Sequence, residues 1–187
     1  MPYTEKFEKA LLRASRLHRD QVRKGTNVPY ITHLLAVASI VGENGGTEDE
    51  VVAALLHDAP EDQGGEVRLE EIRAQFGDEV AKIVDGCTDT YEDPKPPWRE
   101  RKERYLAHLA DATNSVRLVS SADKLHNART VLADYRLLGE DLWPRFNGKK
   151  EGTLWYYRAV ADTLRGDGPI AEELARVVTE LERLARG

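Results

Sequence analysis

Ionisable residues are concentrated at the end of one apolar segment of the chain. In the stretch VVAALLHDAPED, residues 51–62, six apolar residues precede His57, Asp58, Glu61 and Asp62. Burying so many ionisable groups beside a hydrophobic core costs several kcal/mol unless a partner compensates their charge. We therefore expect a compensating partner at this point of the fold, and a bound cation would serve.

Two chemically similar residues lie in other helical segments. His33 begins one such segment, and Asp123 lies within the most apolar of the late ones. Together with His57 and Asp58 they offer two imidazoles and two carboxylates, a ligand set compatible with a divalent transition metal. Taken singly, each residue has an ordinary explanation as a capping, packed or ion-paired side chain. A metal site explains all four together and is the favoured interpretation.

The elements that must carry these residues are predicted to be helices. Apolar residues recur at helical spacing along almost the whole chain, whereas alternating strand patterns are scarce. The sequence predicts an all-α fold of about eight to ten helices in a single domain, residues 1–187, with a C-terminal helix in 166–187. The expected helices lie near residues 4–24, 33–41, 47–58, 69–77, 78–89, 99–112, 114–135, 150–166 and 169–187.

The end of the third predicted helix decides whether two neighbouring residues can bind the same metal ion. Successive side chains on a helix diverge by about 100°, so His57 and Asp58 reach one ion together only where the helix ends. Thr47 is the predicted N-cap of this helix, and the acidic residues 48–50 favour the positive end of its dipole. Pro60 is consistent with a helix end close to Asp58.

Composition and charge exclude several classes of protein. The chain has 187 residues, of which 41% are hydrophobic and 32% charged, as in a soluble globular protein. It contains neither an apolar run of about 20 residues that would span a bilayer nor a signal peptide. The single cysteine, Cys87, cannot form an intrachain disulfide and is expected to be a core residue. With a net charge of −6, we expect a cytoplasmic protein without a membrane or nucleic-acid partner.

Four sequence motifs resemble one family of enzymes. The order His33, His57-Asp58 and Asp123 matches the H…HD…D pattern of the HD-domain metal-dependent phosphohydrolases. The segments RKGTNVPYITHLLAVASIV, AALLHDAPED, FGDEVAKIVDGCTD and SADKLHNART resemble the hydrolase domain of the RelA/SpoT homologues. They are similar in particular to the stand-alone small alarmone hydrolases of the metazoan SpoT homologue type. The resemblance covers about residues 5–165 and implies a helical HD-domain bundle.

The resemblance also implies a set of functional residues. It implies one divalent metal, usually Mn²⁺ in that family, bound by two histidines and two aspartates: His33, His57, Asp58 and Asp123. The acidic pair Glu61 and Asp62 falls where the family activates or orients the attacking water. The basic pair Arg23 and Lys24 falls where the family contacts the nucleotide.

Two further residues, Asn127 and Thr130, fall on positions that line the substrate pocket in the family. Helix geometry supports this assignment independently, because Asp123, Asn127 and Thr130 are spaced i, i+4 and i+7 on one helix face. The family often has Thr-Val between its HD and ED pairs, whereas this chain has Ala59-Pro60. The segment WPRFNGKKEGTLWYY also departs from the metazoan homologue, and we expect it to reshape the pocket.

The activity implied by the resemblance is hydrolysis of the 3′-pyrophosphate of ppGpp or pppGpp, giving GDP or GTP and pyrophosphate. The same site would suit another nucleotide phosphohydrolase, namely an NADPH 2′-phosphatase or a ppApp hydrolase. A third hypothesis is a non-catalytic nucleotide sensor, which the loss of a ligand or of the acidic pair would have favoured. The expected partner is a small-molecule nucleotide, and the sequence is compatible with a homo-oligomer and with functional pairing with an alarmone synthetase.

Overall fold

The computed structural model describes residues 2–92 and 94–186, so residues 1, 93 and 187 of the predicted domain lie outside the described residues. The predicted all-α fold is confirmed. Apart from an isolated antiparallel bridge between Val22 and Pro29, the described residues form no strand. The helices are α1 (Glu5–Leu17), α2 (Ile31–Glu43), α3 (Glu48–Leu56), α4 (Ala59–Gln63), α5 (Gly65–Phe76), α6 (Asp78–Cys87), α7 (Trp98–Ala110), α8 (Asn114–Leu138), the 3₁₀ helix η1 (Gly139–Arg145), α9 (Lys149–Thr163) and α10 (Pro169–Arg186).

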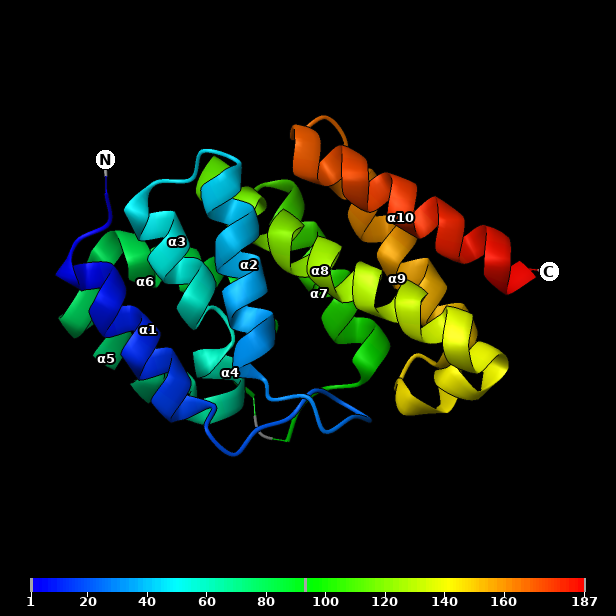
Figure 1. Ribbon diagram of the computed structural model, residues 1–187, viewed down its shortest axis with the longest axis horizontal. Helices are drawn as coiled ribbons and strands as arrows, with labels where there is room; N and C mark the ends of the chain where they lie inside the picture. Colours follow the sequence, from blue (N-terminus) through cyan, green and yellow to red (C-terminus); the bar gives the residue numbers. More distant parts are fainter. Residues whose placement is uncertain (1, 93, 187) are drawn as a thin grey trace.

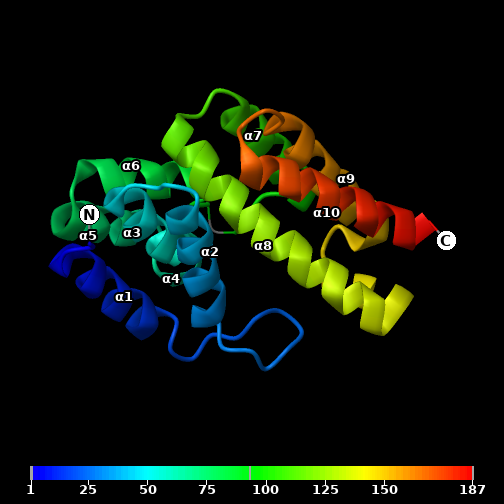
Figure 2. The ribbon, with the colours of Figure 1, turned by 45° about the horizontal axis from the view of Figure 1, so that its top comes forward.

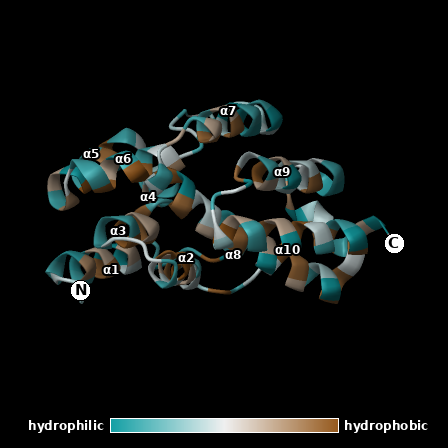
Figure 3. Ribbon diagram, turned by 90° about the horizontal axis from the view of Figure 1, so that it is seen from above, coloured by the Kyte–Doolittle hydropathy of each residue, from teal (hydrophilic) through white to brown (hydrophobic). Residues whose placement is uncertain are grey.

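Helix α8 connects the two halves of the bundle. It packs against α2, α3 and α6 on one side and against α9 and α10 on the other. Figure 2 shows α8 running diagonally between these two groups of helices. Figure 3 shows hydrophobic and hydrophilic residues alternating along the helical ribbons, the amphipathic pattern that predicts this fold class. A polar residue on α8 can therefore face the α2–α3 side of the bundle while the same helix also packs against α10.

Helix α3 is a buried helix that carries functional residues at its end. All six residues of the segment 51–56 are buried, in agreement with the apolar sequence VVAALL. The helix begins with a capping box, in which the Thr47 hydroxyl accepts from the Glu50 backbone N–H and the Glu50 carboxylate accepts from the Thr47 N–H. The predicted N-cap at Thr47 is thus confirmed. Because α3 is anchored at its start and buried along its length, the position of His57 after it is well defined.

The first predicted helix is shorter than expected. The prediction of a helix over 4–24 was wrong at its C-terminal end, because α1 ends at Leu17. The residues that follow form a loop closed by backbone hydrogen bonds, from Tyr30 N to Gln21 O (2.9 Å) and from Arg23 N to Val28 O (2.8 Å). These non-local bonds replace the helical bonds that a continuation of α1 would have made, and they bring the loop toward the start of α2.

Pro60 has a different role from the one expected. Helix α3 ends at Leu56, before the proline, and Pro60 lies in the first turn of the next helix, α4. A proline fits this position because the first N–H groups of a helix have no partner within the helix. The break between the two helices therefore falls at His57 and Asp58, which allows both side chains to reach one ion. Helix α5 likewise begins at Gly65, four residues before the predicted segment.

Two smaller expectations concern membranes and Cys87. In the described part of the chain, no helix is long and apolar enough to cross a membrane. The Cys87 thiol lies 3.6 Å from the Ser120 hydroxyl, and burial raises the pKa of the thiol to about 11. The thiol is therefore protonated near neutral pH, which agrees with a packing role rather than a nucleophilic one.

Candidate metal centre

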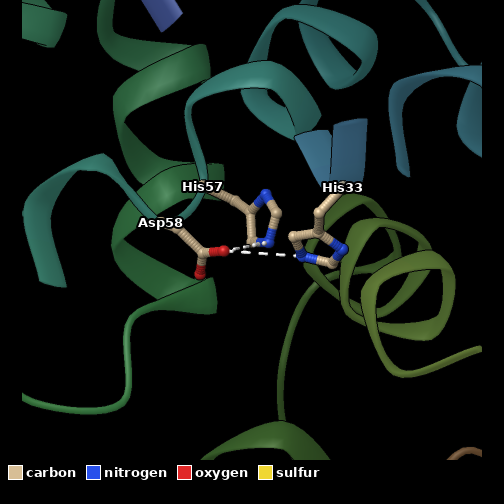
Figure 4. A group of neighbouring side chains, drawn as sticks. All are labelled: His33, His57 and Asp58. Carbon is tan, nitrogen blue, oxygen red and sulfur yellow. Dashed lines mark ion pairs between the residues drawn. The ribbon is translucent and has the colours of Figure 1, made fainter. Parts of the chain in front are cut away.

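Two separate segments deliver three of the predicted metal ligands to one point. His33 comes from the first turn of α2, and His57 and Asp58 come from the junction of α3 and α4. Figure 4 shows these three side chains pointing toward one another, and their ligand atoms all lie within 4.8 Å of one another. The structure therefore brings together residues that are up to 25 positions apart in the sequence, from His33 to Asp58.

Asp123 of α8 joins the same cluster from the opposite side of the bundle. Its Oδ1 atom lies 3.2 Å from His33 Nε2 and 3.7 Å from His57 Nε2. The Oδ2 atom of Asp58 lies 3.5 Å and 3.1 Å from the same two nitrogens. Two imidazole nitrogens and two carboxylate oxygens thus face a common centre.

The two imidazole nitrogens at this centre have no hydrogen bond. His33 is 0% and His57 2% exposed, and neither Nε2 atom has a hydrogen-bond partner among residues 2–92 and 94–186. The nearby carboxylate oxygens approach them without hydrogen-bond geometry. Buried polar nitrogens without a partner are rare in folded proteins and require an explanation. A divalent cation explains them, because imidazole and carboxylate together form a suitable donor set, and the residues fit such a group.

The tautomer of His57 is set by the backbone. Its Nδ1 atom lies 2.8 Å from the carbonyl oxygen of Ala54, which can only accept a hydrogen bond. In the neutral ring, the form that binds a metal, the proton therefore resides on Nδ1 and Nε2 presents a lone pair to the centre. Metal-ligating histidines almost always donate their other ring N–H in this way.

The charges at the centre favour a cation. Burial raises the pKa of Asp58, but His57 and His33 beside it outweigh burial and hold that pKa well below its usual range. Burial also raises the pKa of Asp123, but Lys124 and the two histidines outweigh burial and hold that pKa well below its usual range. For His57, burial lowers the pKa, yet the adjacent carboxylates raise it well above the usual value. Two ionised carboxylates therefore face the centre, which attracts positive charge.

Neighbouring side chains orient both carboxylates. The Tyr30 hydroxyl donates to Asp58 Oδ2 over 2.6 Å. Asp123 accepts from Asn127 Nδ2 and from Lys124 Nζ, each over 2.5 Å. Such outer contacts hold metal ligands in a fixed orientation. Asn127, predicted to line a substrate pocket, therefore also contacts a candidate ligand.

The acidic pair lies in the first turn of α4, directly after the candidate ligands. Asp62 Oδ2 accepts from Gln21 Nε2 over 2.7 Å, and desolvation and the charge of Asp58 raise the pKa of Asp62 to about 6. Glu61 forms an ion pair of 2.9 Å with Lys95. Each carboxylate of the pair is thus held by a different loop, and neither of these contacts involves a candidate metal ligand.

A cavity of about 200 Å³ adjoins the centre. All four predicted substrate residues lie in its wall: Arg23, Lys24, Asn127 and Thr130. Tyr30 and Asn127, which bond the two candidate carboxylate ligands, are also in the wall, so the cavity and the centre share side chains. Arg23 Nη2 donates to Asn127 Oδ1 over 2.6 Å, which links the basic pair to the α8 face that carries Asp123.

A second cavity, of about 160 Å³, shares Lys24, Phe146 and Tyr157 with the first. It also includes Lys102. Burial and the nearby Lys124 lower the pKa of Lys102 to about 7. Phe146, Tyr156 and Tyr157 of the WPRFNGKKEGTLWYY segment line this cavity together with Trp98, which agrees with the expectation that this segment shapes the pocket. Tyr157 lies in the walls of both cavities, whereas the sequence favoured a core-filling role for it and left base stacking as the alternative.

Two histidines contact residues of the site, whereas the sequence favoured a surface or packing role for His18 and a structural or pocket-rim role for His126. His126 Nδ1 lies 2.8 Å from His33 Nδ1, and burial, with the charges of His33 and Arg23, lowers the pKa of His126 to about 4. Its position three residues after Asp123 was the available signal, because residues at i and i+3 share a helix face. His18 is buried, stacks on Tyr30 with 5.2 Å between ring centroids, and bonds Gln21 through Nδ1.

The family model described as HD domain matches residues 10–153. A guanosine-3′,5′-bis(diphosphate) 3′-pyrophosphohydrolase MESH1 from Xenopus tropicalis is 41% identical over 121 residues, which are 63% of this chain and 65% of that protein. The match therefore spans a little less than two thirds of this curated relative.

Two solved structures have a similar fold. A metazoan ortholog of SpoT that hydrolyses ppGpp superposes with a TM-score of 0.77 at 26% identity, covering 100% of this chain and 98% of that one. The crystal structure of lmo0812 from Listeria monocytogenes EGD-e gives a TM-score of 0.72 at 31% identity, covering 81% of this chain and 99% of that one. Since the family model covers most of the sequence, the chain belongs to the HD domain family.

Proposed function

We propose that this protein hydrolyses the 3′-pyrophosphate of ppGpp or pppGpp, releasing pyrophosphate and leaving GDP or GTP. One observation carries the proposal: two unpartnered imidazole nitrogens and two ionised carboxylates face one point beside a pocket with a cationic pair. The MESH1 relative carries the name of this activity, and the metazoan SpoT ortholog is described as hydrolysing ppGpp. Both support the choice of substrate.

The proposed metal is a single Mn²⁺ ion held by His33, His57, Asp58 and Asp123. A mixed set of imidazoles and carboxylates suits this ion, because carboxylates favour Mn²⁺ and imidazoles tolerate it. When bound, the ion would supply Lewis-acid stabilisation of the negative charge that develops on the phosphoryl oxygens.

The acidic pair is proposed to handle the attacking water and its proton. With a pKa of about 6, Asp62 is ionised at neutral pH and still basic enough to accept a proton. Gln21 holds one of its oxygens, so the carboxylate has a defined orientation. Glu61, held by Lys95, is proposed to orient the water from the other side.

The two adjoining cavities are proposed to bind the nucleotide. Lys24 lies in the walls of both, and Lys102 lies in the second, so a phosphate chain would meet a cation in either cavity. Arg23 lies over the Tyr30 ring, 5.7 Å from its centroid, and its planar guanidinium suits both phosphate and an aromatic base. Phe146 and Tyr157 offer aromatic surface for the base.

A substrate panel tests the proposal. Protein stripped of metal is incubated with ppGpp, pppGpp, ppApp or NADPH, with and without Mn²⁺, and the released group is identified. We expect pyrophosphate from the guanosine nucleotides only when Mn²⁺ is present, and no turnover by Asp123→Asn.

Two results would contradict the proposal in different ways. Preferential release of phosphate from NADPH, or turnover of ppApp in preference to ppGpp, would overturn the substrate. Tight binding of ppGpp without turnover by metal-replete protein would instead identify a nucleotide sensor.

A further inference from the structure

Among the described side chains, only His126 bonds to Nδ1 of His33, the ring nitrogen that does not face the metal centre. The two Nδ1 atoms lie 2.8 Å apart, and the ring centroids are 4.9 Å apart. One nitrogen of such a pair must carry a proton and the other must be bare, because two protonated or two bare nitrogens cannot share a hydrogen bond. The direction of this hydrogen bond therefore sets the tautomer of both rings.

The surroundings of His33 determine that direction. If His126 were the donor, the neutral His33 ring would carry its proton on Nε2. That atom is buried and faces the centre, 3.2 Å from Asp123 Oδ1 and 3.5 Å from Asp58 Oδ2. An N–H at this position has no lone pair to offer, so His33 could not bind a cation there. With His33 Nδ1 as donor, Nε2 instead keeps a lone pair directed to the centre that Asp58 and Asp123 share.

The two candidate histidine ligands differ in how their tautomer is held. The partner of His57 is a backbone carbonyl, which can never act as a donor. The partner of His33 is a side chain that can be either a donor or an acceptor, so the tautomer of His33 depends on the identity of residue 126. His126 is placed for this contact by α8 itself, since it follows the candidate ligand Asp123 by three residues on the same face.

We infer that His126 is a positioning residue for the metal site: its bare Nδ1 accepts from His33 Nδ1–H and holds His33 in the tautomer whose Nε2 can bind the cation. The inference rests on the metal site of the proposed function and adds a residue that neither the motif nor its spacing assigns. His126 does not touch the metal or the substrate in this role. It acts only through His33.

Metal affinity tests the inference without measuring catalysis. His126→Phe keeps a ring of similar shape but removes the acceptor, whereas His126→Asn places an amide oxygen close to the position of Nδ1. His108→Ala is the matched control, because His108 is exposed on α7. Mn²⁺ binding to stripped protein is measured by titration calorimetry. We expect His126→Phe to bind Mn²⁺ about 10 to 100 times more weakly than the wild type, and the Asn and control variants to bind nearly normally.

A spectroscopic measurement distinguishes this role from a merely structural one. In metal-free protein labelled with ¹⁵N-histidine, long-range ¹H–¹⁵N spectra report which ring nitrogen carries the proton. We expect His33 to be protonated at Nδ1 in the wild type and in His126→Asn, with this pattern lost in His126→Phe. Thermal unfolding without metal, compared among the variants, separates loss of affinity from loss of folding.

The outcomes separate this inference from the proposed function. Wild-type protein that binds no Mn²⁺ would overturn both. Wild-type protein that binds Mn²⁺ and hydrolyses ppGpp, together with a folded His126→Phe variant of unchanged affinity, would overturn only the role of His126. A wild-type His33 ring that is bare at Nδ1 in the metal-free protein would also overturn that role.

Discussion

Asp123 has two partners of opposite kind, and substituting it should have two separable effects. On one side it faces the imidazole nitrogens of the candidate metal centre. On the other it forms an ion pair of 2.5 Å with Lys124, and the two side chains are only 7% and 14% exposed. The Lys124 ammonium also lies over the Tyr105 ring, 5.0 Å from its centroid. Asp123→Ala therefore removes a candidate metal ligand and leaves a buried ammonium without its carboxylate.

The stability effect can be estimated from this burial. Breaking a buried ion pair by removing one partner destabilises a protein by about 3–5 kcal/mol. For a chain of this size, each kcal/mol lowers the melting temperature by about 2–4 °C, so Asp123→Ala should melt about 6–20 °C below the wild type in EDTA. Replacing both partners by apolar groups is often neutral. Asp123→Ala/Lys124→Met should therefore recover much of the lost stability.

Calorimetric melts and a turnover assay separate the two effects. Both variants should fail to bind Mn²⁺ and to hydrolyse ppGpp, although only the single variant should be strongly destabilised without metal. If the double variant regained Mn²⁺ binding together with stability, Asp123 would be a structural residue and not a ligand. If the single variant melted like the wild type in EDTA, the Asp123–Lys124 ion pair would contribute little to stability.

Three further predictions concern metal, acid and the core. Mn²⁺ at about 100 times its dissociation constant should stabilise the stripped protein by about 2.7 kcal/mol, and an unchanged melting temperature would contradict a metal site. Glu48 accepts from Thr4 and from the Phe7 backbone, chiefly from the Thr4 N–H, and these bonds hold its pKa below the usual value. Its folded pKa is the lower one, so its stabilisation is present above the ordinary pKa of a glutamate and is lost as the pH falls through the folded value. Glu48→Gln should flatten the acid side of the stability profile, and an unchanged profile would count against this. Leu55→Ala, at a site with 0% exposure, should lower the free energy of unfolding by about 2–5 kcal/mol in denaturant titrations. Leu137→Ala, 83% exposed, should change it little, and equal effects would refute the assigned core.

Local periodicity predicted most of the helices because each amphipathic helix carries its own pattern of burial. The start of α3 was predicted for the same reason, since the capping box at Thr47 involves residues three positions apart. The end of α1 was not predicted. Residues 18–24 contain no strong helix breaker, and α1 stops because Gln21 pairs with Tyr30 across a loop. A bond between residues nine positions apart leaves no periodic signal.

The same distinction between local patterns and contacts between distant segments applies to the candidate site. The sequence alone determined which residues share one face of a helix, as with Asp123, Asn127 and Thr130, because 3.6 residues per turn places them together. Only the tertiary structure decided that α2, the α3–α4 junction and α8 meet at one point, and that His126 bonds His33. Contacts between helices depend on how their surfaces pack, and no local repeat in the chain specifies that packing.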